Sequence, residues 1–161
     1  MARNDGEVPS QRLPDYDYSS AGAYFVTICA YRRAPIFVSP KATHAVYACW
    51  SEIPSHFAVE LDAFVVMPNH VHGIVVLPRA GHARPLQSIV GTFKSAAARS
   101  INRLRGTPGE PVWQRGYFER VVRSERELEV LREYVLNNPA AWSADQENPH
   151  RTARLASAPW L

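Results

Sequence analysis

The stretch Phe64–Pro78, FVVMPNHVHGIVVLP, consists of two apolar runs that meet at a Pro-Asn turn. Both runs are rich in β-branched residues, which favour strands, and proline followed by asparagine favours a tight turn. The pattern predicts two antiparallel strands, residues 59–67 and 70–78, joined as a β-hairpin. The rest of the fold prediction is built outward from this hairpin.

Two histidines, His70 and His72, interrupt the apolar pattern at the start of the second strand. Side chains two residues apart in a strand point to the same face, so the two imidazoles are expected side by side. Gly73 is expected to leave backbone room beside the pair. Two imidazole nitrogens can hold a metal ion, but hydrogen-bonded or solvent-facing histidines would give the same pattern. A metal site therefore needs a third ligand from elsewhere in the chain.

The remaining elements follow from apolar periodicity and from capping signals. Ser39 is an expected helix N-cap, and Ser124 with Glu127 is an expected capping box. In chain order the prediction is a strand (23–31), a helix (39–57), the two hairpin strands, a helix (84–104), a short strand within 112–123 and a helix (124–138). This order predicts an α+β fold with one antiparallel sheet and helices packed on it.

The length of 161 residues and the apolar content of 46% suit one domain with a substantial core. Residues 1–21 are polar and interrupted by proline, so we expect an N-terminal arm, followed by a domain (22–142) and a C-terminal tail (143–161). No apolar run has the length of a membrane helix, and the N-terminus has no apolar core of the signal-peptide kind. Cys29 and Cys49 lack CxxC spacing and are expected to be reduced core thiols of a cytoplasmic protein.

Arginine dominates the basic residues, since only Lys41 and Lys94 of the 18 are lysine. Between residues 79 and 132, ten arginines and one lysine stand against five glutamates. Arginine binds phosphates through two nitrogens and stacks on bases, so this stretch fits a nucleic-acid-binding surface. A solvated face of an arginine-rich protein explains the charge equally well.

The last predicted helix offers a third metal ligand. Tyr134 and Asn138 are four residues apart, so their side chains lie on one helix face. Asn138 directly precedes Pro139 at the helix end, where its amide oxygen can reach sideways. On spacing alone, a tyrosine at the edge of the core and an asparagine cap are the simpler interpretation.

Several motifs together resemble those of a known family. MPNHVHGIVVLP resembles the His-hydrophobic-His motif of the HUH single-strand DNA endonucleases, and REYVLNNPAAW resembles the tyrosine helix of their one-tyrosine transposase branch. RLPDYDYSSAGAYFVTICAYRR, GTFKSAAARSIN and VWQRGYFERVVRSERELEVLREYVLNNP are similar to the REP-associated tyrosine transposases, a match that runs from about Arg12 to Trp142. One departure is Glu119 followed by Arg120, where many relatives carry an acidic residue followed by histidine.

The resemblance implies a ferredoxin-like or RRM-like antiparallel sheet with helices packed on it. It implies that His70, His72 and Asn138 bind a divalent metal, Mg²⁺ or Mn²⁺, and that Tyr134 is the nucleophile that forms a 5′-phosphotyrosine. The implied partners are single-stranded DNA hairpins such as REP palindromes, with no membrane partner. A monomer or homodimer in the cytoplasm, associated with the nucleoid, is expected.

Candidate DNA contacts come from the basic stretch and from the N-terminal arm: Lys94, Arg99, Arg103, Arg105, Arg115, Tyr16 and Tyr18. The long predicted helix (84–104), with the arginines at its end, is expected to hold the hairpin stem. Two other functions remain open at this stage, a hairpin-binding protein without catalysis and a metal-dependent phosphodiesterase that uses activated water.

Tyr134 has rivals among the other tyrosines. Tyr117 lies in the basic segment WQRGYFER but has no ligand-type residue at helical spacing, so it is expected to be structural or to contact DNA. Tyr24, Tyr31 and Tyr47 lie in apolar patterns and are expected in the core.

Overall fold

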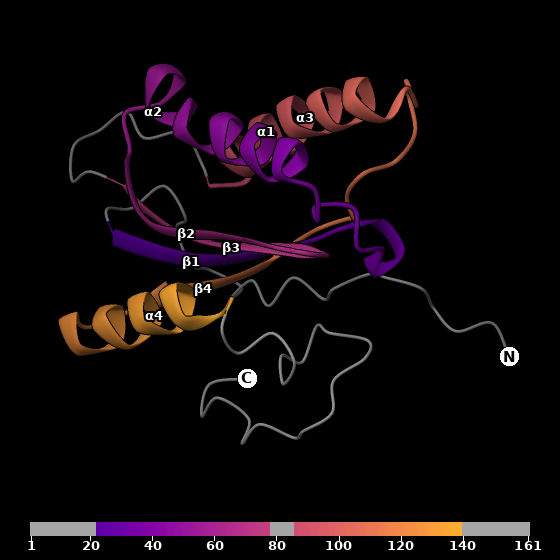
Figure 1. Cartoon of the computed structure of the whole chain (residues 1–161). Coiled ribbons are helices and arrows are strands. Elements are labelled where there is room, and N and C mark those ends of the chain that lie inside the picture. The colour runs from indigo at the N-terminus through magenta and orange to yellow at the C-terminus, as the bar shows by residue number, and fades with distance from the viewer. Residues whose placement is uncertain (1–21, 78–85, 140–161) are drawn as a thin grey trace, which may run out of the picture.

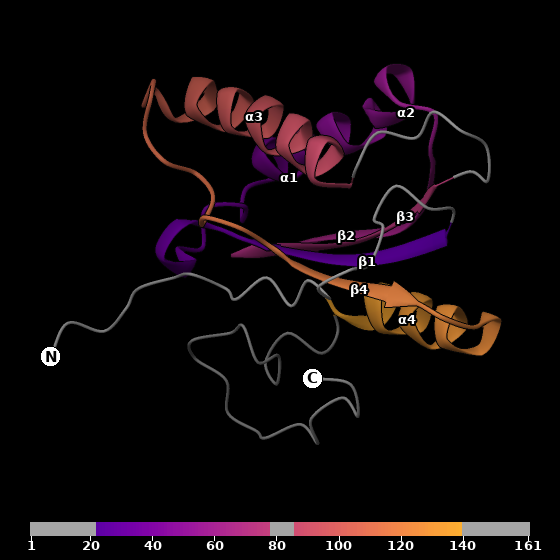
Figure 2. The same cartoon turned by 180° about the vertical axis from the view of Figure 1, so that it is seen from behind.

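The computed structural model describes residues 22–77 and 86–139, which form an antiparallel sheet with helices on both faces (Figures 1 and 2). The strands are β1 (Gly22–Cys29), β2 (Glu60–Met67), β3 (His70–Leu77) and β4 (Phe118–Val122). Their spatial order is β2-β3-β1-β4, and every neighbouring pair is antiparallel. Helices α1 (Pro40–Ser51) and α3 (Leu86–Arg105) cover one face, and α4 (Glu125–Asn137) covers the other. This is the predicted ferredoxin-like α+β arrangement.

Most element bounds agree with the sequence prediction to within two residues, but the helix predicted for 39–57 is divided. It forms α1 and a short α2 (Ile53–His56), with Glu52 between them. Pro54 explains the division, because a proline inside a helix removes a hydrogen bond and clashes with the preceding turn. The expected N-cap is present, since Ser39 Oγ accepts the Ala42 N–H at 3.1 Å.

The larger core lies between the sheet and the pair α1 and α3. Alternate residues of β1 and β3 point into it, because side chains alternate across a strand. The apolar stripe predicted for the long helix is confirmed, with every member buried: Leu86, Ile89, Val90, Phe93, Ala97 and Ile101. A smaller core lies under α4 and contains Phe25, Val65, Met67, Ile74, Leu131 and Val135.

Gly73 serves the larger core, and the expectation that it makes room for the histidine pair is wrong. A Cβ on Gly73 would lie 2.5 and 2.6 Å from two ring carbons of Trp50. Trp50 itself is stacked on Phe64, with ring centroids 4.3 Å apart. Gly73 alternates with His72 along β3, so it points to the opposite face and admits the indole there.

The tyrosines divide between core and surface. Tyr24 is fully buried as expected, but Tyr31 and Tyr47 are 39% and 38% exposed. Tyr31 lies in the short helical turn η1 (Tyr31–Arg33) beyond the end of β1, where the alternation of the strand no longer applies. Tyr47 lies about 100° around α1 from the buried Val46, because a helix turns by that angle per residue.

Both cysteines within the described part of the chain are free thiols; Cys29 is buried as expected, but Cys49 is only half-buried. In residues 22–77 and 86–139, no helix combines the length and the apolar character needed to cross a membrane. The predicted arm with Tyr16 and Tyr18, the end of the predicted domain near residue 142 and the predicted tail lie outside the described residues.

Candidate active site

His70 and His72 occupy the start of β3 and face α4. His70 pairs across the sheet with Cys29 of β1 and Met67 of β2, and His72 pairs with Thr27 and Val65. Strands on both sides and α4 below leave the two side chains 0% and 3% exposed. The solvent-facing alternative for these histidines is therefore wrong.

The two imidazoles point their Nε2 atoms at each other, at a distance of 3.0 Å. Each Nδ1 atom is held by a neighbouring side chain, that of His70 by Asn69 Oδ1 and that of His72 by Thr27 Oγ1, both at 2.8 Å. Such partners on the far nitrogen fix the ring orientation of metal-binding histidines. The prediction that the imidazoles lie side by side is confirmed.

Both imidazoles are neutral near pH 7. Burial lowers the pKa of His72 to about 3. Burial also lowers the pKa of His70 well below its ordinary value, and the nearby charges of His72 and Arg33 act in the same direction. Neutral imidazoles leave a lone pair for a metal ion, which a protonated pair would not.

One arrangement of hydrogens satisfies this network. Asn69 Oδ1 accepts from His70 Nδ1–H, so His70 Nε2 is an acceptor. His72 Nε2–H then donates to His70 Nε2, and the Thr27 hydroxyl donates to His72 Nδ1. If His72 held a metal through Nε2, its proton would be on Nδ1, where Thr27 Oγ1 is placed to accept it.

Tyr134 lies beside His72. Its ring centroid is 5.3 Å from that of His72 and 6.1 Å from that of Phe25. Phe25 is also stacked on His72, at 5.4 Å. Tyr134 is half-buried among the described residues. Helix α4 thus brings the predicted nucleophile to the two histidines, which are more than sixty residues earlier in the chain.

Asn138 follows one helical turn later as the C-cap of α4. It is 3% exposed, and its Nδ2 atom has no hydrogen-bond partner among the described residues. The two ends of an asparagine amide are interchangeable by rotation, so the same position can present the oxygen. A buried amide whose Nδ2 lacks a partner, on the helix face that carries Tyr134, leaves Asn138 as the predicted third ligand.

The donor set of this site fits a hard divalent cation. Within residues 22–77 and 86–139, no three His, Cys, Asp or Glu side chains gather into a metal-binding group. Two imidazole nitrogens and one amide oxygen would leave several positions of an octahedral ion open. Mg²⁺ and Mn²⁺ accept such open sites, and Mn²⁺ binds imidazole more readily than Mg²⁺. His70, His72 and Asn138 therefore remain the predicted ligands.

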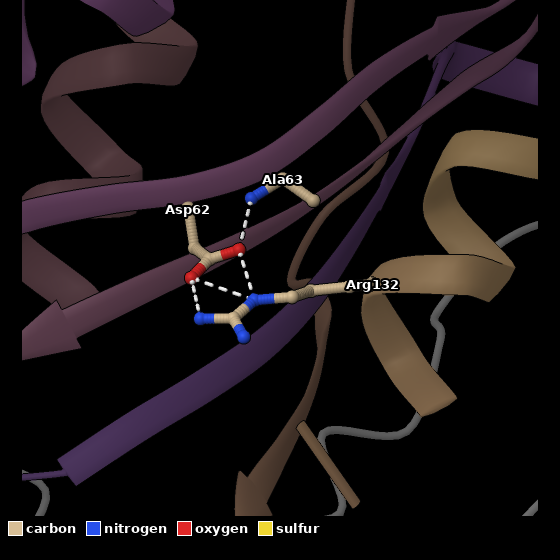
Figure 3. Close-up of polar contacts among 3 residues, drawn as sticks. All are labelled: Asp62, Ala63 and Arg132. Carbon is tan, nitrogen blue, oxygen red and sulfur yellow. Dashed lines mark hydrogen bonds and ion pairs between the residues drawn. The ribbon is translucent and has the colours of Figure 1, made fainter. Parts of the chain in front are cut away.

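Two ion pairs fix α4 on the sheet. At one edge, Arg132 binds both carboxylate oxygens of Asp62 on β2, with Nη2–Oδ2 at 2.6 Å (Figure 3). This hydrogen bond lowers the pKa of Asp62. A β-bulge between Leu61 and Phe64 adds one residue to β2, and Asp62 lies in it. Bulges often redirect a side chain in this way, here toward the helix that carries Tyr134.

At the other edge, Arg120 of β4 binds Glu127 of α4, with Nε–Oε1 at 2.6 Å. Half of the expected capping box is present, since Ser124 Oγ accepts the Glu127 N–H at 3.1 Å. In a complete capping box the Glu127 carboxylate would accept the N–H of Ser124. Here it accepts the N–H of Arg123, one residue earlier, at 2.9 Å. The departure from the family pattern at Arg120 thus supplies an ion pair to the tyrosine helix.

Lys94 is engaged within the protein. Its Nζ donates to the carbonyls of Gln114 and Gly116 at 2.7 and 3.0 Å, and its own carbonyl accepts from Trp113 Nε1 at 3.0 Å. Burial lowers the pKa of Lys94. These contacts join α3 to the segment before β4, so Lys94 has a structural role besides any contact with phosphate.

The remaining DNA candidates of the described chain are exposed, namely Arg99, Arg103, Arg105 and Arg115. The first three belong to α3, which lies on the face of the sheet opposite α4 (Figures 1 and 2). Sequence reasoning did not separate these faces, and α3 does not border the histidine pair. Of these arginines, Arg105 stands at the C-terminal end of α3, where the chain turns back toward β4.

Tyr117 is a structural residue. It is 9% exposed, lies in the core between the sheet and α3, and donates its hydroxyl to Glu119 Oε2 at 3.0 Å. Trp113 and Gln114 are buried as well. The larger core is on the face opposite the histidine pair, so Tyr117 is not a rival to Tyr134.

Sequence reasoning missed the supporting residues Thr27, Asn69 and Asp62. Thr27 is the only polar residue in the apolar run of β1, which was a usable signal. Asn69 was interpreted only as a turn residue. Asp62 carried no signal, because its partner is seventy residues later in the chain.

Comparison with known proteins shows the family of this chain. The family model of IS200-like transposases matches residues 18–138. A Haemophilus influenzae protein of uncharacterised function is 33% identical over 165 residues, covering 85% of this chain and 91% of that protein. A second H. influenzae protein, provisionally named a REP-associated tyrosine transposase, is 23% identical over 129 residues, covering 76% of this chain and 73% of that protein.

Two solved structures have the same fold. A REP-associated tyrosine transposase bound to a REP hairpin gives a TM-score of 0.64 at 20% identity, with 82% of this chain and 74% of that chain covered. A Deinococcus radiodurans R1 protein, provisionally described as a transposase, gives 0.53 at 21% identity, with 79% and 96% covered. These names agree with the branch that the sequence motifs indicate. Since the matched region contains the histidine strand and the tyrosine helix together, this chain belongs to the IS200-like transposase family.

Proposed function

We propose that the protein is a single-strand DNA endonuclease and strand transferase that acts on DNA hairpins through Tyr134. The observation that carries the proposal is the position of the Tyr134 ring, 5.3 Å from the His72 ring on a helix held at both sheet edges. A nucleophile must be held close to the group that it attacks, and a fixed helix does this. The chromosomal DNA of the cytoplasm would be its place of action.

The reaction balances without an external energy source. Tyr134 Oη loses its proton to a base or water and forms a bond to phosphorus. The bond between phosphorus and the 3′ oxygen breaks, and that oxygen takes up a proton to become a free 3′-OH. The 5′ phosphate end stays on Tyr134 as a phosphotyrosine. The same 3′-OH can reverse the step, or another 3′-OH can complete strand transfer.

His70, His72 and Asn138 would hold the divalent metal, Mg²⁺ or Mn²⁺. When bound, the metal would withdraw negative charge from the scissile phosphate. Thr27 and Asn69 orient the imidazoles toward it through their hydroxyl and amide groups. Asp62 and Arg120 hold the helix of Tyr134 in register with the pair.

The proposed substrate is a hairpin with single-stranded flanks, of the REP kind. A relative in a solved complex is bound to a REP hairpin. A flexible strand can bend one phosphate between a sheet and a helix, whereas a duplex brings a second charged backbone with it. A monomer or homodimer remains the predicted assembly.

The test is cleavage of a labelled hairpin oligonucleotide with single-stranded flanks, in Mg²⁺, Mn²⁺ or EDTA. Wild-type protein should give a slow-migrating covalent adduct on a denaturing gel, and the same sequence as a perfect duplex should give little. Tyr134→Phe, His70→Ala and His72→Ala should give none but should still bind the hairpin, and Tyr117→Phe should still form the adduct.

Two outcomes would favour the alternatives. Binding without any cleavage by the wild type would indicate a hairpin-binding protein. Cleavage without an adduct, unchanged in Tyr134→Phe, would indicate a phosphodiesterase that uses activated water.

A further inference from the structure

A hollow of about 560 Å³ lies between η1 and the loop that leads from α3 to β4. Ligand pockets commonly have a volume of about 300–1,000 Å³, so the hollow is large enough for a nucleotide. Its walls combine one aromatic ring, two charged side chains and short apolar groups: Tyr31, Ala34, Ile36, Arg105, Gly106, Thr107, Pro108, Glu110 and Pro111.

The hollow lies at the same end of the sheet as the histidines. Cys29 is the residue of β1 that pairs with His70, and Tyr31 follows two residues later. The Ala30 N–H donates to the carbonyl of Asn69 at 2.8 Å, and the Tyr31 N–H donates to the carbonyl of Val112 at 2.8 Å. Two residues of extended chain span about 7 Å. The hollow and the histidines therefore share this end of the sheet, although the histidines face α4 and the α3 end that lines the hollow lies on the other face.

Hydrogen bonds fix the loop wall of the hollow. The buried Asn102 donates from Nδ2 to the carbonyl of Glu110 at 2.8 Å. Its Oδ1 and its carbonyl accept from the hydroxyl and the N–H of Thr107, both at 3.0 Å. A wall that is already ordered loses little freedom when a ligand binds.

The other wall carries the aromatic ring. Tyr31 is 39% exposed, and the guanidinium of Arg32 lies 5.2 Å from its ring centroid. Arg32 and Arg33 both have φ of 53°, in the left-handed region that residues other than glycine rarely adopt. Unusual backbone of this kind is concentrated at functional sites.

The chemistry of the walls fits a nucleobase. A tyrosine ring offers a flat apolar surface for stacking, and guanidinium groups both stack on bases and donate to their edges. Arg105 and Glu110 supply a donor group and an acceptor group on the opposite wall. A phosphate alone would need neither the ring nor the carboxylate.

We infer that this hollow binds one base of the single strand that flanks the hairpin. The inference rests on the proposed function. It adds a site that would fix which nucleotide of the DNA strand lies at the cleavage site. Stacking on Tyr31 would hold that base while the scissile phosphate lies over His70 and His72.

The experiment compares hairpin oligonucleotides whose single-stranded foot carries one abasic position at a time, with affinity measured by fluorescence anisotropy. For wild type, one position should lower affinity about tenfold, the usual contribution of one stacked base. Tyr31→Ala should bind the intact hairpin about tenfold more weakly than wild type does. Making the same position abasic should not weaken its binding further. Tyr31→Phe should behave as wild type, because it keeps the ring.

Tyr47→Ala is the matched control, since Tyr47 is 38% exposed and lies on α1. It should show the wild-type profile. Arg105→Ala is a second variant that changes the hollow. In this variant, the same abasic position should lower affinity less than it does in wild type. If the losses from Tyr31→Ala and from every abasic position simply add, the base is not in this hollow.

The adduct at Tyr134 separates the two levels of the proposal. If the wild type forms the adduct but the affinity losses from Tyr31→Ala and from each abasic position add, only the base site is overturned. Absence of both the adduct and hairpin binding in the wild type would overturn the proposed function itself.

Discussion

Arg132 and Asp62 form a bidentate ion pair, in which Nε lies 2.8 Å from Oδ1 and Nη2 lies 2.6 Å from Oδ2. The pair joins α4 to the edge strand β2, two residues before Tyr134. Two parallel contacts restrict the direction of both side chains more than a single contact does. Together with the Arg120–Glu127 pair at the other edge, it holds the helix, and with it the Tyr134 ring, beside His72.

Arg132→Met should slow cleavage much more than it lowers stability. The pair is partly exposed, so its loss should change the urea midpoint only slightly. A displaced nucleophile costs far more, and single-turnover cleavage should slow by roughly tenfold or more. Arg126→Met on the same helix, at an exposed position, is the control. Exchanging the charges, Asp62→Arg together with Arg132→Asp, should restore part of the cleavage rate. If Arg132→Met and Arg126→Met change the cleavage rate and the urea midpoint equally, Arg132 does not position the helix.

Thr27→Val should weaken metal binding and leave the fold intact. Valine keeps the shape of threonine but removes the partner of His72 Nδ1. Loss of such a partner commonly lowers metal affinity about 10- to 100-fold. Mn²⁺ binding by calorimetry measures the effect without any cleavage assay. Thr43→Val is the control, because Thr43 Oγ1 donates to the Phe37 carbonyl at 3.0 Å, away from the histidines. An unchanged Mn²⁺ affinity in Thr27→Val would show that the hydroxyl does not support the site.

The metal-free protein should lose stability as the pH falls below about 6.5. The ordinary histidine pKa is near 6.5, and burial lowers the pKa of His72 to about 3 and that of His70 in the same direction. Between these values the unfolded chain binds protons and the folded chain does not. Each histidine should therefore lower the free energy of unfolding by up to about 1.4 kcal/mol per pH unit.

Urea midpoints at pH 7.5, 6.0 and 5.0 measure this dependence. Above pH 7 the two histidines are neutral in both states and should add no slope. The double variant His70→Gln/His72→Gln should lose most of the slope below pH 6.5. The same slope in the variant and the wild type would mean that other groups cause the acid sensitivity.

Gly73→Ala should destabilise the protein without changing metal affinity. The added Cβ would lie 2.5 Å from the Trp50 ring, which is buried and stacked on Phe64. Overpacking of this kind costs about 1–3 kcal/mol. Gly91→Ala on α3 is the control, because its Cβ would have no atom within 4 Å. It should be neutral or slightly stabilising, since alanine favours helices. Equal stability of Gly73→Ala and wild type would mean that Trp50 can move aside.

The sequence was sufficient for features that depend on neighbours in the chain. The hairpin, the buried stripe of α3 and the pairing of His70 with His72 on one face all follow from local periodicity. The implied proximity of Tyr134 to the histidines came from the resemblance. The spacing of the tyrosine and the asparagine alone favoured a simpler interpretation.

Local periodicity could not predict the pairing register of the strands or which face of the sheet each helix covers. Alternation shows which residues share a face, but it does not show which helix covers that face. For this reason the pattern leaves open which face α3 covers, and it wrongly assigns Gly73 to the histidines. Thr27 supports His72 because β1 pairs with β3 in one register, and no local pattern fixes that register.

Strand β3 carries two kinds of residue in alternation, and this limits how its sequence can change. His70 and His72 face the tyrosine helix, whereas Val71 and Gly73 face the larger core. A substitution in this strand alters one of the two faces and leaves the other as it is. An insertion or deletion of one residue would exchange the faces, turning the imidazoles toward Trp50 and valine toward Tyr134. A replacement such as His72→Ala or Gly73→Ala should therefore damage one face of the sheet, whereas a change of one residue in length at the start of β3 should damage both.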